Sequence, residues 1–367
     1  MAATPPAKAP RFLVLDAMRG LGALFVVFGH YHFELWPNRP GFIVESHAYL
    51  VVDLFFLLSG FVLAHAFYDK PTFDMWDYTK KRIFRLWPLH AAALLAALLL
   101  MYFSGDAING FGLLLNILLL HNIGIGDWEM VGINYPSWSL SVELVANIVV
   151  GFIILAIPSR RWNSLILALI SIASAVILFF TVDNMNQQVN NVFGVVNTGL
   201  LRGFITFPAG ILAYRFYMAH KAKFERTSWL RTLIVAVLLG FFMASVALPS
   251  PGKADFLFLP LYALVIIGVS SPGAFWNSFS KYFRVLGEIS FAMYVSHMVI
   301  LKLMKETGFW PHDYLLGLLF AWTASCLVAA LAHYGFEKPV YSWATKRWCK
   351  PAPAKSSEKA ALSASTF

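Results

Sequence analysis

The sequence predicts an all-α integral membrane protein, a bundle of about ten transmembrane helices with short interfacial or re-entrant helices. Hydrophobic residues make up 59% of the 367 residues and charged residues only 13%, whereas an ordinary soluble domain carries roughly 25% charged residues. Apolar runs long enough to cross about 30 Å of hydrocarbon recur from Leu13 to Phe336. These runs are continuously apolar and do not alternate in period two, which argues against a β-barrel.

The first two spans, predicted at residues 12–33 and 48–67, define the orientation of the bundle. Asp16 and Arg19 lie inside the first run, so we interpret it as a retained helix and not as a signal peptide. If the tail 1–11 is cytoplasmic, the loop that follows the second span is cytoplasmic as well. That loop is basic, which is the positive-inside pattern. The pattern accounts for the net charge of +9 without a nucleic-acid partner.

The remaining spans cross the membrane in alternating directions, given the same cytoplasmic N-terminus. The run at 111–120 is too short to cross the bilayer and is predicted to be re-entrant or interfacial. Further spans are predicted at 88–103, 138–157, 165–180, 200–218, 232–248, 256–269, 286–304 and 314–334. Both termini are then cytoplasmic, with one transmembrane domain at 12–340 and a largely disordered basic tail at 341–367. Two cysteines, one in a span and one in this tail, do not indicate a disulfide framework.

The first span carries a polar stripe. Asp16 and Arg19 are three residues apart and can pair on one helix face. His30 follows Arg19 by eleven positions, a net rotation of about 20° and a rise of roughly 16 Å. Charged groups in a membrane face a partner or a water-filled cavity because lipid contact costs several kcal/mol. We therefore take Arg19 and His30 as candidate catalytic residues; the alternative is a structural Asp16–Arg19 pair with an interfacial His30.

Two acidic residues at depth are further candidates. Asp53, in the outer half of the second span, is expected near the level of His30, where a carboxylate would fix the tautomer of the imidazole and raise its basicity. Glu143, about two turns into the span at 138–157, is expected at a similar depth. Its alternative is a polar packing residue. The Ser59–Gly60 pair is better explained by close helix packing than by chemistry.

The basic run KKRIFRLWP presents Arg82 and Arg85 on one face of a short helix. Paired guanidinium groups suit the phosphates of a CoA donor, although anchoring at the cytoplasmic face would need the same residues. Glu288, His297 and Glu337 add polar groups late in the chain without an assigned role. No glycine-rich phosphate loop, HExxH or paired CxxC motif occurs, so no metal site is expected.

Six segments occur in a characteristic order: LDAMRG, VDLFFLLSGF, KKRIFRLWP, NYPSWSLSVE, GEISFAMYVSH and FEKP. Together they resemble the type-three membrane acyltransferase family of bacteria, which includes acetylases of O-antigen, exopolysaccharide and nodulation factor. The resemblance implies acyl-CoA as donor substrate, with no permanently bound cofactor, and a hydroxyl of a carbohydrate or lipid-linked glycan as acceptor. It also implies that Arg19 and His30 form the essential pair and that Arg82 and Arg85 form a cytoplasmic RxxR element.

The resemblance further implies the bacterial inner membrane as location, and the stand-alone form of the enzyme without an extracytoplasmic hydrolase-like domain. Acetyl is the commonest acyl group in the family; succinyl and longer chains are alternatives. His30 is expected to act as general base, with a covalent acyl-histidine as the other route. A transporter or flippase that uses the same buried charges is the competing class, and the absence of an internal repeat counts against it. A non-catalytic scaffold would leave the polar stripe unexplained.

Overall fold

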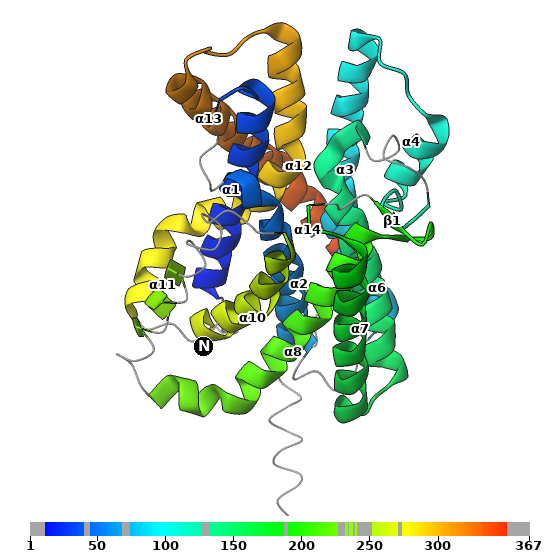
Figure 1. The fold of residues 1–367 in the computed structure, drawn as a ribbon, viewed down its shortest axis with the longest axis vertical. Coiled ribbons are helices and arrows are strands. Elements are labelled where there is room, and N and C mark those ends of the chain that lie inside the picture. The colour runs from blue at the N-terminus through cyan, green and yellow to red at the C-terminus, as the bar shows by residue number, and fades with distance from the viewer. Residues whose placement is uncertain are drawn as a thin grey trace, which may run out of the picture.

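The structure, a computed structural model, describes residues 12–39, 45–67, 74–125, 132–186, 190–226, 232–233, 235–237, 239–240, 252–270 and 274–350. The long helices (Figure 1) are α1 (Leu13–Leu35), α2 (Val51–Phe67), α3 (Met75–Ser104), α6 (Trp138–Ala156), α7 (Arg160–Thr181), α8 (Thr198–Arg226), α12 (Arg284–Thr307) and α13 (Tyr314–Ala332). The shorter ones are α4 (Gly110–Ile117), α10 (Phe258–Val269), α11 (Ala274–Ser280) and α14 (Lys338–Trp348). Short 3-10 helices occur at Glu45–Leu50, Gly132–Ser137, Lys253–Leu257 and Lys281–Phe283, with a π-helical turn at His333–Glu337. The only sheet in these ranges is an antiparallel pair, β1 (Asn191–Val192) with β2 (Val196–Asn197).

Seven helical segments of the described chain are long and apolar enough to cross a membrane. This confirms an all-α, multi-pass membrane protein. The 29-residue helix α8 is longer than several of the seven, but it carries charged residues among its apolar ones. Helix α10 has 12 residues and a length of about 18 Å, too little to cross the hydrocarbon alone. Most of the predicted span at 232–248 lies outside the described residues.

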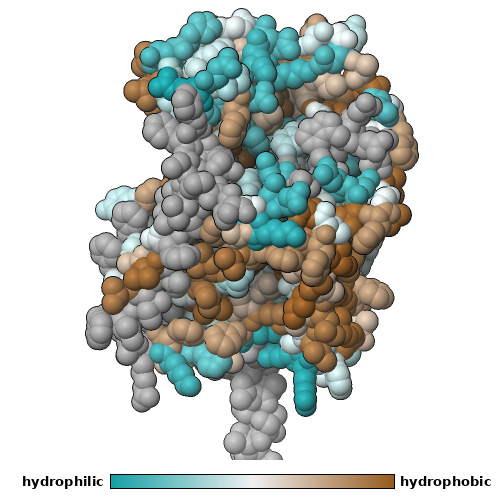
Figure 2. Space-filling model, in the orientation of Figure 1, coloured by the Kyte–Doolittle hydropathy of each residue, from teal (hydrophilic) through white to brown (hydrophobic). Residues whose placement is uncertain are grey.

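Helix α7 exposes an apolar face, as expected for a helix that contacts lipid. Large apolar side chains that are more than 45% exposed recur along one stripe of this helix: Leu165, Leu169, Ile172, Val176 and Phe180. Their spacing of three or four residues places them on one face. Only 17% of the apolar window of α7 is buried, against 67% for the window that contains α2. Helix α2 is therefore central and α7 peripheral. Apolar residues dominate the lower half of the face in Figure 2, with hydrophilic residues at its upper end and along its lower edge.

Helix α3 begins earlier than the sequence indicates. The predicted span starts at residue 88, but the helix starts at Met75 and runs through Pro88 without a break. Asp74 caps its first turn by accepting the N–H of Asp77 at 2.9 Å, and this hydrogen bond holds the pKa of Asp74 below its usual range. The basic run is thus the first part of a 30-residue helix, because a capped start and continuous packing outweigh the proline. The basic tail predicted from residue 341 is also helical at its start, where it belongs to helix α14 (Lys338–Trp348).

The short run at 111–120 forms α4, a helix of eight residues, about 12 Å long. It is too short to cross the membrane, as predicted. It packs beside α3, whose Trp87 Nε1 donates to the carbonyl of Ile117 at 2.8 Å. His90 Nε2, also on α3, bonds the carbonyl oxygen of Asn116 at 2.8 Å.

The directions of neighbouring helices agree with the predicted alternation. Contacts between α1 and α12 advance together along both helices, from Arg19 with Ser290 to His30 with His297. These helices are therefore parallel, as expected for two spans that both run outward. Helices α2 and α8 are also parallel. Gly60 and Gly210 let them pack closely, because a Cβ at either glycine would collide with a backbone carbonyl of the other helix.

Candidate functional site

The polar stripe of α1 faces α12. Arg19 Nη2 donates to Asp16 Oδ1 at 3.2 Å and to the carbonyl of Gly287 at 2.9 Å, and Arg19 Nε donates to Ser290 Oγ at 3.0 Å. The two helices approach closely at Gly20 and Gly287, where an added Cβ would strike the opposing backbone. The Asp16–Arg19 pair thus forms as its spacing predicts, and α12 holds the guanidinium in place.

Arg19 lies on the wall of a cavity of about 350 Å³, which we call the arginine cavity. Four of the six candidate residues line it, namely Arg19, Arg82, Arg85 and Glu143. They come from three helices: α1, α3 and α6. Apolar and aromatic side chains supply most of the remaining lining, among them Phe12, Leu15, Val52, Phe55, Phe56, Val62, Phe291 and Tyr294. The carboxylates of Asp16 and Glu143 also line the cavity, and Arg19 and Arg85 are paired with Asp16 and Glu337. Three guanidinium groups in a mainly apolar cavity can still present donors to an anion.

The two arginines of α3 differ in their surroundings. Arg82 lies over the ring of Tyr78, 5.3 Å from its centroid. Arg85 lies 5.0 Å from the ring centroid of Phe291 and forms an ion pair with Glu337. The Glu337 carboxylate is buried and also bonds His333 Nδ1 at 2.9 Å. Its position on a π-helical turn is typical of functional segments. Glu337 therefore orients Arg85 toward the cavity.

Glu143 does not reach His30. Its Oε1 accepts a hydrogen bond from Ser59 Oγ on α2 at 3.0 Å, so the Ser59–Gly60 pair combines close packing with a polar contact. The sequence places Glu143 near the depth of His30, but the structure places it on the arginine cavity. The reason is the rotation of α6, which directs this residue toward α2 and α3.

His30 lines a second cavity of about 380 Å³, the histidine cavity. Its walls carry aromatic and amide side chains, with Tyr49, Tyr135, Trp138 and Asn186 among them. Val52 and Tyr294 line both cavities, so the two cavities are neighbours separated by these side chains. The arginines and the imidazole of His30 thus line two adjoining cavities.

The expected partnership of His30 with Asp53 is wrong. Asp53 lies near the same end of the bundle, but its carboxylate pairs with Arg202 of α8, with Oδ2 at 2.7 Å from Nη2 and Oδ1 at 3.2 Å from Nε. Both side chains are at most 1% exposed. His30 Nδ1 instead lies 2.8 Å from Nε2 of His297 on α12. The face of α2 that carries Asp53 packs on α8, which decides the partner.

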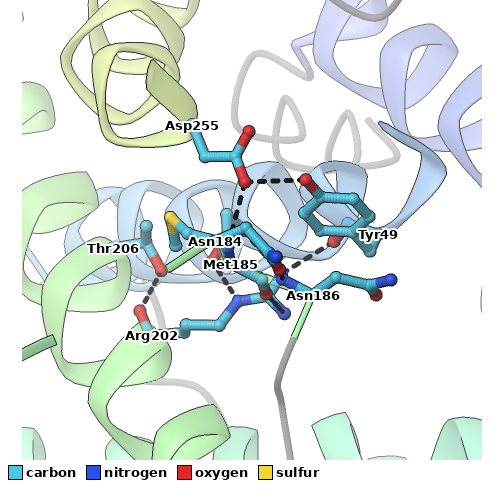
Figure 3. A network of polar contacts seen from close by, with 8 residues as sticks. Tyr49, Asn184, Met185, Asn186, Arg202, Thr206 and Asp255 are labelled. Atoms are coloured by element: carbon cyan, nitrogen blue, oxygen red, sulfur yellow. Dashed lines mark hydrogen bonds and ion pairs between the residues drawn. The ribbon is translucent and has the colours of Figure 1, made fainter. Parts of the chain in front are cut away.

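Arg202 is not among the site residues that the sequence predicts. Its guanidinium also donates to the carbonyls of Met185 and Tyr49, at 2.8 and 2.7 Å. Tyr49 Oη and the backbone N–H of Met185 both donate to Asp255 Oδ2. Figure 3 shows this network, which ties four segments into the wall of the histidine cavity. The sequence does contain a signal for Arg202: it lies within the predicted span at 200–218, and charged residues inside a membrane are rare and mark functional or paired positions.

The arrangement combines an imidazole in one cavity with guanidinium groups in the adjoining cavity. The imidazole of His30 can take or give a proton, and the arginines can hold phosphate groups. Among the described residues no group of three or more His, Cys, Asp or Glu side chains could hold a metal ion.

The sequence is similar to known proteins. Residues 12–338 match the family described as an acyltransferase domain. A stretch of 106 residues, 28% of this chain, is 44% identical to half of protein 2 in the picA locus of Rhizobium radiobacter. A stretch of 99 residues, 26% of this chain, is 33% identical to a quarter of the acyltransferase MdmB of Streptomyces mycarofaciens. The matches thus span half the length or less of these curated relatives.

Proposed function

The chain belongs to the acyltransferase family, and from this premise we propose that it moves an acyl group from acyl-CoA to a hydroxyl of a carbohydrate or lipid-linked glycan. One observation carries the proposal: the cavity lined by three arginines adjoins the cavity lined by His30. A CoA ester is a polyanion joined by a long, uncharged arm to a reactive thioester. A cavity lined by arginines that adjoins a cavity lined by an imidazole matches that order of groups.

The phosphates of the donor bind at Arg82 and Arg85 in this proposal. Both guanidiniums line the arginine cavity and present fork-shaped sets of donors that suit phosphate oxygens. Arg19, fixed by Asp16, Ser290 and Gly287, orients the pantetheine arm or stabilises charge further along the path. The apolar lining accommodates the uncharged arm, which carries the thioester past Val52 and Tyr294.

The reaction takes place at His30. The acceptor hydroxyl gives its proton to the imidazole while its oxygen bonds the thioester carbonyl carbon. The bond from that carbon to sulfur breaks, and the CoA thiolate takes the proton from the imidazolium. The second route passes the acyl group first to His30 and then to the acceptor. Acetyl is the first acyl group to test, followed by succinyl and longer chains.

The cellular setting of the proposal is the bacterial inner membrane, with both termini in the cytoplasm. The lipid bilayer, acyl-CoA and the glycan acceptor are the partners; acyl-CoA is a substrate, and no permanently bound cofactor or nucleic acid is required. The basic residues of the cytoplasmic loops then serve orientation.

The test of this function uses the purified protein in lipid nanodiscs. Acyl-CoA, with a glycan extract as acceptor, should yield free CoA thiol, and mass spectrometry should detect the matching acyl mass on the glycan. Surface glycans of a deletion strain should lack that acyl mass and the complemented strain should regain it. A transporter or flippase would leave the thioester intact, so unchanged acyl-CoA together with movement of the glycan would refute the proposal.

The double change Arg82→Gln with Arg85→Gln should raise the KM for acyl-CoA by at least roughly 10-fold, because each hydrogen bond to a charged group contributes about 1.5–3 kcal/mol. Initial rates against donor concentration give this KM. The matched control is Lys80→Gln with Lys81→Gln, which removes the same charge from the same helix at positions that do not line the cavity. Arg82→Gln is also measured alone, because Arg85 pairs with Glu337. An equal rise in the lysine control would show that the arginines act only as anchors.

The donor and acceptor should enter from opposite sides of the membrane. His30 lies about 27 Å along α1 from Phe12, whereas Arg82 and Arg85 lie near the start of α3, which the basic loops place at the cytoplasmic face. Vesicles of known orientation, with acyl-CoA on one side and the acceptor on the other, should support transfer when the donor is cytoplasmic. Transfer only when both substrates are cytoplasmic would contradict passage through the bundle but not the acyltransferase function.

A further inference from the structure

The imidazole of His30 is paired with a second imidazole and not with a carboxylate. His30 Nδ1 and His297 Nε2 are 2.8 Å apart, and the two rings lie nearly parallel at 9°, with centroids 5.0 Å apart. His297 is completely buried, whereas His30 borders the histidine cavity. The two residues therefore differ in access: only His30 can meet a substrate.

The second nitrogen of His297 is also occupied. Its Nδ1 lies 2.8 Å from the backbone carbonyl oxygen of Tyr294. A carbonyl oxygen only accepts, so Nδ1 of His297 carries a proton and donates it. A neutral imidazole holds one N–H, and Nε2 of His297 is consequently an acceptor. The hydrogen in the contact between the rings must then belong to Nδ1 of His30.

We propose that His297 is the positioning residue that holds His30 in the tautomer with Nδ1 protonated and Nε2 free for the acceptor hydroxyl, an inference that rests on the proposed function. In a neutral histidine one nitrogen donates and the other accepts, and the hydrogen bond at one determines the state of the other. His297 thus performs the orienting task that a carboxylate performs in Ser-His-Asp sites. Because His297 is uncharged, it orients the base without a negative charge beside the imidazolium.

Hydrogen bonds to the backbone around His297 hold this part of α12 in place. Its own carbonyl accepts a hydrogen bond from Tyr31 Oη at 3.0 Å, and that hydroxyl also bonds Ser325 Oγ at 2.8 Å. Tyr31 and Ser325 are both fully buried. Helices α1, α12 and α13 are thereby joined at this level. In the other tautomer of His297 a bare Nδ1 would face the carbonyl oxygen of Tyr294, which also only accepts, so this contact favours one arrangement.

This tautomer specifies which nitrogen atom of His30 takes part in each proton transfer. The acceptor hydroxyl proton goes to Nε2 of His30 as the new C–O bond forms and the C–S bond of the thioester breaks. The same proton leaves Nε2 for the CoA thiolate. The Nδ1 proton stays on His30 throughout, bonded to His297. In the opposite tautomer Nε2 would carry a hydrogen at the start and could not accept the proton.

Two substitutions of His297 separate orientation from packing. His297→Leu removes the acceptor and should lower kcat by at least about 10²-fold, the lower range for general-base catalysis, with little change in the KM for acyl-CoA. His297→Gln supplies an amide oxygen near the position of Nε2, and it should retain at least a tenth of the wild-type kcat. Equal losses in the Leu and Gln variants, or a loss expressed mainly in donor KM, would overturn the positioning role.

A matched control is available in a second buried histidine pair. His90 and His121 stack with ring centroids 6.1 Å apart, and neither lines a described cavity. His90→Leu should lower thermal stability while kcat per folded protein stays within a few fold. A fall in kcat as large as that of His297→Leu would show that any buried histidine pair has this effect.

The tautomer can be measured without catalysis. Nitrogen-15 NMR of histidine-labelled protein, with the His30 signals identified by their loss in His30→Ala, should show a protonated Nδ1 and a bare Nε2. His297→Leu should mix the tautomers of His30. A bare Nδ1 in the wild type would overturn the inference even if acyl transfer is confirmed, and the predicted signals without acyl transfer would overturn only the proposed function.

Discussion

His30→Ala is expected to lower acyl transfer by about 10²–10⁴-fold, the usual contribution of a positioned general base. His30 lines the histidine cavity, and its Nδ1 is engaged by His297, so Nε2 is the ring nitrogen available to a substrate. The donor KM should change little, because the guanidiniums proposed to bind the phosphates line the other cavity. Release of free CoA thiol by purified protein gives kcat and KM together.

The control for this change lies two residues further along the same helix. His32 is buried against Tyr314, 3.1 Å from its hydroxyl, and borders neither described cavity. His32→Gln should therefore affect stability more than turnover. Both variants are compared at equal amounts of folded protein, judged by gel filtration and thermal melting. Near-normal turnover in a well-folded His30→Ala protein would remove His30 from the mechanism.

Arg202→Met is expected to destabilise the fold by about 3–5 kcal/mol, the usual cost of removing one partner from a buried ion pair. The change leaves the Asp53 carboxylate buried without its cation, and it frees the carbonyls of Met185 and Tyr49. Thermal melting in detergent should show a lower midpoint. The wall of the histidine cavity would loosen at the same time, because Tyr49 belongs to both the network and the cavity.

The double variant Asp53→Leu with Arg202→Met tests whether Asp53 acts structurally. Replacing both members of a buried pair by apolar residues is often neutral or stabilising, so the midpoint should rise well above that of Arg202→Met. If transfer recovers along with stability, Asp53 is a structural partner of Arg202. Restored stability with transfer still about 10²-fold down would support a direct role for Asp53 in the reaction. A wild-type midpoint in Arg202→Met alone would contradict the structural importance of the pair.

Much of the candidate site follows from local sequence features. The spacing of Asp16, Arg19 and His30 predicts one helix face, and these residues do line the two adjoining cavities. Arg82 and Arg85 share a helix face because they are three residues apart, and both reach the arginine cavity. These predictions need only helix geometry, which is the same for every sequence.

Partners across helices are harder to predict. Depth alone predicts Asp53 as the partner of His30, whereas Asp53 pairs with Arg202. The assignment failed because depth does not specify the rotation of a helix about its axis. Glu143 shows the same effect: it faces Ser59 and the arginine cavity and not His30.

The sequence by itself determined that this is an all-α membrane protein. It also determined near which end of each helix the polar residues lie, and which of them share a helix face. Hydropathy, charge and helical period are properties of a single segment, so the surrounding fold is not needed to infer them. Only the tertiary structure decided that His30 pairs with His297 and Asp53 with Arg202. These partners are 267 and 149 positions apart in sequence. Their meeting depends on which helices pack together and how each is rotated, which is set by close contacts such as those of Gly20 with Gly287 and Gly60 with Phe207.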